Sequence, residues 1–458
     1  MRRTDRLTRG RIASLAWPII LANAAVPLLG LADTAVIGHF ASLEDLGAVA
    51  FGSVIFSFVY WGFGFLRMGT TGFVAQAAGA GDEAEVRAAL VRALLLALAI
   101  SLTLLLVQVP IRDSALFLLG GSDPVSELAG SYFSIRIWGA PATLGLFALV
   151  GILIGLGKSK TLLLVQLFLN GLNIALDILF AGVLDMGADG IALGTALAEW
   201  CSLLFALLIV WRLLRERHRD AEPFVPVTRL RALAPLRRTL GANSDIMIRT
   251  LLLVSSFAWF VRQSGEFGDA VLAANHILLQ LISFSAFFLD GFAFVAEAVT
   301  GAAAGSGRRR RFDIAVRRST ELAAGSALLL AAGVLLGGEF AVRALTGHSV
   351  VQLAAIDQLL PVAVYILLSF AAFQLDGIFI GTTRTAEMRN ATLAATAAFF
   401  LLSFPLTAAL GVTGLWLALI ALVLLRAVAL LYYYPALRRS IRPATTSLKP
   451  SLRSPARH

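Results

Sequence analysis

The sequence predicts an all-α polytopic membrane protein, with twelve transmembrane helices in two six-helix lobes related by a parallel internal repeat. Composition is the first reason. Hydrophobic residues make up 58% of the 458-residue chain and charged residues only 14%, and the mean hydropathy is +0.83. Soluble domains carry roughly a quarter of charged residues. The second reason is that short sequence patterns recur about halfway along the chain.

The two halves share four patterns at nearly one offset. GILIG at 151–155 returns as GIFIG at 377–381, an offset of 226 residues. The further pairs are LGAVAF at 46–51 with LAANHI at 272–277, GAG at 79–81 with GSG at 305–307, and GADGIAL at 187–193 with GVTGLWL at 411–417, the last at an offset of 224. Four matches in one order predict a duplicated unit. Many secondary transporters are built this way, with the binding site between or within the repeats.

Uncharged runs of about 20 residues are long enough to span the hydrocarbon core, and Gly, Pro and charged residues indicate where each run ends. The expected helices cover 12–38, 46–78, 86–109, 127–157, 161–183, 189–214, 239–264, 272–303, 312–337, 352–382, 387–410 and 413–436. Helices are expected throughout, because backbone polar groups in lipid have to be hydrogen-bonded within the segment.

These spans divide the chain into five parts. They are a cytoplasmic N-terminal tail (1–11), an N-terminal lobe (12–214), a cytoplasmic basic linker (215–238), a C-terminal lobe (239–436) and a cytoplasmic, disordered basic tail (437–458). Most Arg and Lys residues lie in the two tails and in every second loop, whereas the opposite loops are acidic. By the positive-inside rule, both termini are therefore expected in the cytoplasm.

Several function classes are disfavoured by the sequence. The net charge of +10 is typical of nucleic-acid binding proteins, but the basic residues lie at span ends, so no nucleic-acid partner is expected. The single cysteine, Cys201, excludes an internal disulfide or a Cys-rich metal site. Phosphate-binding loops, HExxH, GxSxG and clustered DDxxD carboxylates are absent, so the chain is not expected to be an enzyme or to hold a cofactor.

Polar residues near the outer ends of three helices form the main candidate site. Asp33 lies in the first predicted helix, Asn170, Asn173 and Asp177 share one face of the fifth, and Thr195 lies in the sixth. Helical rise places Asp33, Asp177 and Thr195 roughly 8–10 Å below the outer surface. Two carboxylates, an amide and a hydroxyl suit a proton site or a hard cation such as Na⁺. Simple hydrogen bonding between helices is the alternative for the amide and hydroxyl.

The C-terminal lobe does not repeat this set. At the 226-residue offset, Asp33 corresponds to Trp259 and Asp177 to Ser403. An ionisable side chain inside a span is costly and is a functional candidate by default. The remaining candidates for secondary substrate binding or gating are Asn170, Arg67, Asp290, Glu297 and Asp376.

Arg67, Arg136 and Arg249 are the intramembrane basic residues that are expected to pair with these acids. Arg67 or Arg249 paired with Asp376 would form a gate, and a purely structural ion pair is the alternative.

These patterns together resemble the multidrug and toxic compound extrusion (MATE) family. The resemblance rests on LADTAVIGH around Asp33, LNGLNIALDILF around Asp177 and GADGIALGTALAEW at the start of the sixth helix. FVAEAVTG around Glu297 and LDGIFIGTTRTAEMRN around Asp376 are similar to the DinF-type branch. The family consists of antiporters with two V-arranged lobes that export organic, often cationic compounds in exchange for H⁺ or Na⁺.

The resemblance implies a cation- or proton-coupling site at Asp33, Asn173, Asp177 and Thr195, with Na⁺ as the possible metal. Similarity to the DinF-type branch favours H⁺. It also implies small organic cations as substrates and a monomer in the bacterial inner membrane. The seventh helix has no carboxylate in mid-span, since Asp245 is near its cytoplasmic end. A second sodium site of the NorM type is therefore not expected.

Three other functions stay open. A flippase for lipid-linked precursors belongs to the same superfamily, but such proteins usually have fourteen spans and a strongly cationic cavity. An integral membrane lipid-modifying enzyme would need clustered metal-binding carboxylates. An uncoupled channel or receptor is compatible with the sequence alone. Neither the substrate nor the choice between H⁺ and Na⁺ follows from the sequence, because generic apolar cavities and carboxylates serve many ligands.

Overall fold

The computed structural model describes residues 7–40, 42–120, 122–218 and 221–441, without the side chains of residues 26–40 and 43. Every regular element in this part of the chain is helical. The N-terminal lobe comprises α1 (Arg9–Phe40), α2 (Leu43–Trp61), α3 (Phe65–Ala80), α4 (Glu83–Leu106), α5 (Gln108–Leu119), α6 (Asp123–Arg136), η2 (Ile137–Gly139), α7 (Ala140–Gly155), α8 (Ser159–Asp177), η3 (Ile178–Val183) and α9 (Gly187–Arg217).

The short helix α10 (Val227–Leu230) lies in the linker. The C-terminal lobe comprises α11 (Leu233–Glu266), α12 (Asp269–Gly305), α13 (Arg309–Leu345), α14 (Ser349–Ile356), α15 (Leu359–Gly381) and α16 (Thr385–Ser440). The linker is shorter than the predicted 215–238, because α9 continues to Arg217 and α11 begins at Leu233.

Ten helical segments of the described residues are long and apolar enough to cross a membrane. The last two predicted spans, 387–410 and 413–436, are joined in α16, whose helical geometry is interrupted at Gly411 (φ 59°, ψ −136°). The helix α1 covers the first predicted span, but the side chains of much of its length lie outside the description. The all-helical, multi-span fold is confirmed, and the number of twelve spans stays a prediction.

Several predicted helices are interrupted, among them the span at 352–382, which is divided into α14 and α15 at Asp357 and Gln358, and the span at 86–109, which is broken between α4 and α5 at Val107. The span predicted at 46–78 is divided into α2 and α3 around Gly62 and Gly64. The span at 127–157 contains the 3₁₀ turn η2 just before Pro141, which has no N–H to continue the hydrogen-bond ladder. The span at 161–183 ends in the π-helix η3, directly after Asp177. Such π segments are rare and are frequently found at functional sites.

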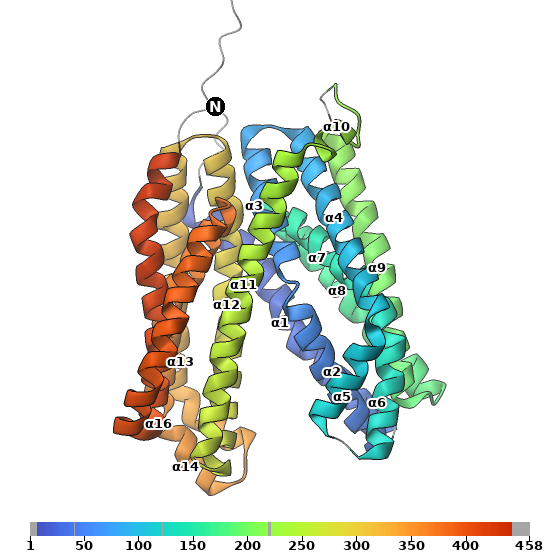
Figure 1. Ribbon diagram of the computed structural model, residues 1–458, viewed down its shortest axis with the longest axis vertical. Coiled ribbons are helices and arrows are strands. Elements are labelled where there is room, and N and C mark those ends of the chain that lie inside the picture. The colour runs from blue at the N-terminus through green and yellow to red at the C-terminus, as the bar shows by residue number, and fades with distance from the viewer. Residues whose placement is uncertain (1–6, 41, 121, 219–220, 442–458) are drawn as a thin grey trace, which may run out of the picture.

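The helices form two lobes, α1 to α9 and α11 to α16 (Figure 1). The ribbons of the lobes approach each other at the end where α10 lies, and they diverge towards the opposite end. We call the first end the basic end, because Arg11, Arg217 and Arg311 gather around one pocket there. The positive-inside rule predicts that this end faces the cytoplasm.

Reciprocal glycine contacts hold the lobes together and follow the repeat. A Cβ atom on Gly79 in α3 would lie 2.1 Å from the carbonyl oxygen of Ala302 in α12, and one on Gly305 would lie 2.0 Å from that of Gln76. Gly79 corresponds to Gly305 and Gln76 to Ala302 at the 226-residue offset. The two contacts are therefore equivalent across the repeat, and only glycine permits so close an approach of helix backbones.

Candidate cation and gating sites

The helices α8 and α9 bring three of the predicted site residues together. The Asn173 side-chain amide donates a hydrogen bond of 3.2 Å to the Thr195 hydroxyl. Asn173, Asp177 and Thr195 are 1%, 0% and 8% exposed. The Asn173 amide oxygen accepts no hydrogen bond from any described residue. A buried acceptor of this kind suits a bound cation or a water molecule, because leaving it unpaired costs roughly 1–3 kcal/mol.

Asp177 is the last residue of α8 and lies directly against α9. A Cβ atom on Gly194 would be only 2.5 Å from Oδ1 of Asp177, so the carboxylate contacts the α9 backbone beside Thr195. This contact depends on the glycine in the sequence GIALGT. The carboxylate, amide and hydroxyl oxygens thus occupy one buried region of the N-terminal lobe, as the helix depths predicted.

Asn170 connects this region to α1. Its side-chain amide donates to the backbone carbonyl of Ala25 in α1 at 3.3 Å, and its oxygen accepts from Gln166 at 2.9 Å. The helix α1 packs against α8, η3 and α9. Asp33 belongs to α1, but its side chain lies outside the described residues. The predicted approach of its carboxylate to Asp177 therefore stays a prediction.

A buried ion pair in the N-terminal lobe was not foreseen. Arg136, at the end of α6, donates to both oxygens of Glu199 in α9, at 2.8 and 2.9 Å. The two side chains are 11% and 8% exposed. Sequence reasoning singled out Arg136 and passed over Glu199. The usable signal was spacing, because Glu199 lies one helical turn after Thr195 in the sequence GTALAE and so shares its face.

A second buried ion pair joins the two lobes. Arg67 in α3 contacts Glu297 in α12 with a distance of 3.1 Å between Nη1 and Oε2. The guanidinium also lies 3.7 Å from the ring centroid of Phe294. Because one partner belongs to each lobe, any separation of α3 from α12 has to break this pair.

Asp376 in α15 pairs with Arg249 in α11, the second of the two predicted partners, and not with Arg67. A further arginine, Arg426 in α16, approaches the same carboxylate oxygen at 3.5 Å. Sequence reasoning missed Arg426, although it interrupts the uncharged run ALVLLRAVALL. Asp290 in α12 forms no hydrogen bond or ion pair with any described residue, but it lies within electrostatic range of Arg67 and Arg249.

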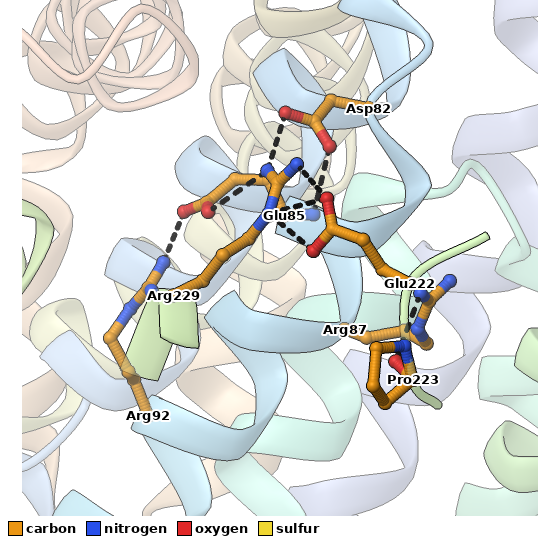
Figure 2. A network of polar contacts seen from close by, with 7 residues as sticks. All are labelled: Asp82, Glu85, Arg87, Arg92, Glu222, Pro223 and Arg229. Carbon is orange, nitrogen blue, oxygen red and sulfur yellow. Dashed lines mark hydrogen bonds and ion pairs between the residues drawn. The ribbon is translucent and has the colours of Figure 1, made fainter. Parts of the chain in front are cut away.

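The linker between the lobes is fastened to the N-terminal lobe (Figure 2). Arg229 of α10 donates to Asp82 at 2.7 Å and to Glu222 at 2.6 Å, and it lies 3.7 Å from Glu85. Arg87 of α4 donates to the backbone carbonyl of Phe224 at 2.8 Å. Asp82 ends the sequence GAGD and also caps α4 by accepting a hydrogen bond from the backbone of Glu85. The predicted helix end at GAGD is therefore correct.

A comparison with protein families decides which family this is. The model described as MatE matches residues 18–179 and 246–409, one segment in each lobe. The chain belongs to the MATE family. It is thus a member of a family of multidrug efflux transporters, as the sequence patterns predicted.

Relatives agree with the branch that the motifs indicated. The chain is 38% identical over 416 residues to the DNA damage-inducible protein F of Escherichia coli K12, covering 91% of this chain and 90% of that protein. It is 32% identical over 308 residues to a probable multidrug resistance protein NorM of Deinococcus radiodurans, covering 64% of each chain.

Solved MATE structures share the two-lobe fold. A crystal structure of MATE in the bent conformation has a TM-score of 0.83 at 21% identity, and the match covers 94% of this chain and 95% of the other. The outward-facing conformation of a multidrug resistance MATE family transporter has a TM-score of 0.79 at 21% identity, and the match covers 94% of this chain and 96% of the other. At these identities the likeness shows the fold alone.

Proposed function

We propose that this MATE protein is a secondary active antiporter that exports organic, often cationic compounds in exchange for H⁺, with Na⁺ as the alternative coupling ion. It acts as a monomer in the bacterial inner membrane, with both termini in the cytoplasm. The buried set of Asn173, Asp177 and Thr195, packed against the helix that carries Asp33, is the observation that supports this proposal most strongly.

The internal repeat adds an argument for pairing Asp33 with Asp177. Their counterparts in the C-terminal lobe are Trp259 and Ser403, and the Trp259 indole N–H donates to the Ser403 hydroxyl at 3.2 Å. The repeat therefore supports our proposal that Asp33 and Asp177 act together. Two carboxylates that face each other inside a membrane protein cannot both be charged without a proton or a cation between them. Such a site is therefore suited to binding and releasing the coupling ion.

The contacts between the lobes supply a gate for alternating access. Glycine packing at Gly79 and Gly305 and the Arg67–Glu297 pair join the lobes in the basic half of the molecule. With the basic end in the cytoplasm, this state is closed to the cytoplasm. Transport then requires a second state in which α3 and α12 separate and Arg67 leaves Glu297.

The decisive experiment is transport by the purified protein in proteoliposomes. A fluorescent organic cation is loaded, and its movement is measured with a pH gradient alone and then with a Na⁺ gradient alone. H⁺ coupling predicts transport with the first gradient only. Asp33→Asn should abolish that transport while insertion and thermal stability remain unchanged. Transport in neither gradient, or wild-type transport by Asp33→Asn, would refute the coupled mechanism.

A Na⁺-driven result would keep the antiporter and change its ion. In that case Na⁺ should raise the melting temperature, because a ligand that binds only the folded state stabilises it. Asp177→Asn should lose this rise, whereas Ser403→Ala, its counterpart in the other lobe, should retain it.

A further inference from the structure

A pocket of about 360 Å³ lies at the basic end, where the two lobes meet. Three arginines and a hydroxyl group line it: Arg11 of α1, Arg217 at the end of α9, Arg311 of α13, and Ser306. No acidic side chain is among the described residues that line it. Arginine side chains of both lobes thus meet at one pocket beside the membrane interface, where their N–H donors suit an anionic ligand.

The arginine geometry suits a phosphate group. Arg217 is held in place by Glu83, which accepts from its Nε at 3.0 Å and from its Nη2 at 2.6 Å. The planar guanidinium has five donors, and this ion pair uses the two on one side. A guanidinium fixed in this way can direct its remaining donors to a second oxyanion, and arginine is the side chain best matched to phosphate oxygens.

The rest of the lining is apolar, which distinguishes a lipid from a free ion. Leu7, Leu15 and Leu156 contribute to it, together with Ala298 and Val299 of α12. Such walls have nothing to offer inorganic phosphate but suit the glycerol and upper acyl carbons of a phospholipid. Basic pockets between transmembrane helices on the cytoplasmic side bind anionic headgroups. We propose that this pocket binds the phosphodiester headgroup of an anionic phospholipid.

The location gives this lipid a defined effect on the transporter. Arg11 and Arg217 belong to the N-terminal lobe, whereas Ser306 and Arg311 belong to the C-terminal lobe. The pocket also includes Gly79 and Ala302, the close contact that closes the basic end. A headgroup bound by arginines of both lobes stabilises the state in which the lobes meet here, and it has to leave or rearrange when they separate. An anionic lipid thus favours the closed basic end.

The sequence offers a matched pair of variants for a test. Arg310 and Arg311 are neighbours in one run of four arginines, but only Arg311 lines the pocket. The full-length protein and the variants Arg311→Gln and Arg310→Gln are purified in detergent. Their melting temperatures are measured with added phosphatidylglycerol, with added phosphatidylcholine, and with inorganic phosphate.

We expect phosphatidylglycerol to raise the melting temperature of the wild-type protein by several degrees more than phosphatidylcholine does. Arg311→Gln should lose at least half of this difference, and Arg310→Gln should keep it. Arg11→Gln serves as a second variant and should also lose it. Three results would overturn the proposal: equal shifts with both lipids, equal losses in Arg310→Gln and Arg311→Gln, or the full shift with inorganic phosphate alone.

Discussion

The two lobes share one scaffold and differ in the polar groups they bury. Close glycine packing is the same in both: a Cβ atom on Gly151 would lie 2.6 Å from the carbonyl oxygen of Arg67, and one on its counterpart Gly377 would lie 2.4 Å from that of Ala293. Arg67 and Ala293 are themselves equivalent at the 226-residue offset. The backbone contacts have therefore been kept through the duplication, even where one partner is charged and the other is not.

Side-chain chemistry has diverged on this common frame. In the N-terminal lobe, Asn173 and Asp177 are buried where the C-terminal lobe has Phe399 and Ser403. The reverse holds for Asp376, whose counterpart in the N-terminal lobe is Val150. At these positions the N-terminal lobe thus buries amide and carboxylate oxygens, whereas the C-terminal lobe surrounds the carboxylate of Asp376 with two arginines. The difference supports our proposal that the coupling ion binds in the N-terminal lobe.

Substitution of Asp177 should have the largest effect. Asp177→Asn removes the one ionisable group of the described N-lobe set and keeps its size, so coupled transport should be lost while the protein still inserts and folds. The control is Ser403→Ala at the equivalent place in the other lobe, which should retain most of the activity. Transport assays in proteoliposomes with a fluorescent cation measure both. If Ser403→Ala is as inactive as Asp177→Asn, the proposal that only the N-terminal lobe binds the coupling ion is wrong.

The next largest effect is expected for the unforeseen Arg136–Glu199 pair. Their counterparts in the C-terminal lobe are the buried apolar residues Val362 and Val423, the latter at the offset of 224. Glu199→Gln leaves Arg136 buried without its counter-charge, which typically costs about 3–5 kcal/mol. We expect a large fall in melting temperature.

The double variant Arg136→Met with Glu199→Leu replaces the ion pair by two apolar side chains, as at the equivalent positions of the C-terminal lobe. It should recover most of the lost stability, because replacing a whole buried pair by apolar residues is often neutral. If transport is also recovered, the pair is structural. If stability returns and transport does not, Glu199 takes part in coupling beside Thr195.

Comparison with the sequence shows which features are local and which are not. Hydropathy, charge asymmetry and the repeat predicted an all-helical bundle of membrane spans, because each depends on neighbouring residues or on one offset. The interruptions at η2 and η3 and the continuous α16 were not predicted. They depend on how a Pro, a Gly or a buried carboxylate is accommodated by adjacent helices, which periodicity within one segment does not encode.

The same limit applies to the sites. The sequence was enough to group Asn173, Asp177 and Thr195. The depth of a residue in the membrane follows from the number of residues between it and the end of its own helix. The partner of Arg136 could not be named, and that of Asp376 could be narrowed only to Arg67 or Arg249, because ion pairing depends on which faces two separate helices turn to each other. Glu199 and Arg426 are each single charges in apolar runs, and a stricter search for such charges would have found both.

A third prediction uses the symmetric contact between the lobes. Gly79→Leu forces a side chain against the α12 backbone, and overpacking of this kind typically costs about 1–3 kcal/mol. Gly305→Leu should have an effect of similar size, because its contact is the repeat-related one. Gly325→Leu is the control, since a Cβ atom there meets nothing within 4 Å.

The variants Gly79→Leu and Gly305→Leu should also loosen the contact between the lobes. A cysteine placed at Ala302 should therefore react faster in both variants with a thiol reagent supplied from the basic end. Unequal effects of Gly79→Leu and Gly305→Leu would show that the two repeat-related contacts between the lobes are not equivalent.

The smallest effect is expected at the linker, which Arg229 of α10 attaches to Asp82 of the N-terminal lobe. The hydrogen bond to Glu222, followed by that to Asp82, holds the pKa of Arg229 above its usual range. A raised pKa stabilises the folded state at every pH below the ordinary arginine value, so the contribution of Arg229 to stability is constant across the physiological range.

Because Arg229 and its acidic partners are partly exposed, Arg229→Gln should lower the free energy of unfolding by no more than about 1 kcal/mol. The loss should shrink in high salt and be the same at pH 6 and pH 8, as measured by thermal unfolding. A loss that depends strongly on pH would mean that a group other than Arg229 controls the attachment of the linker.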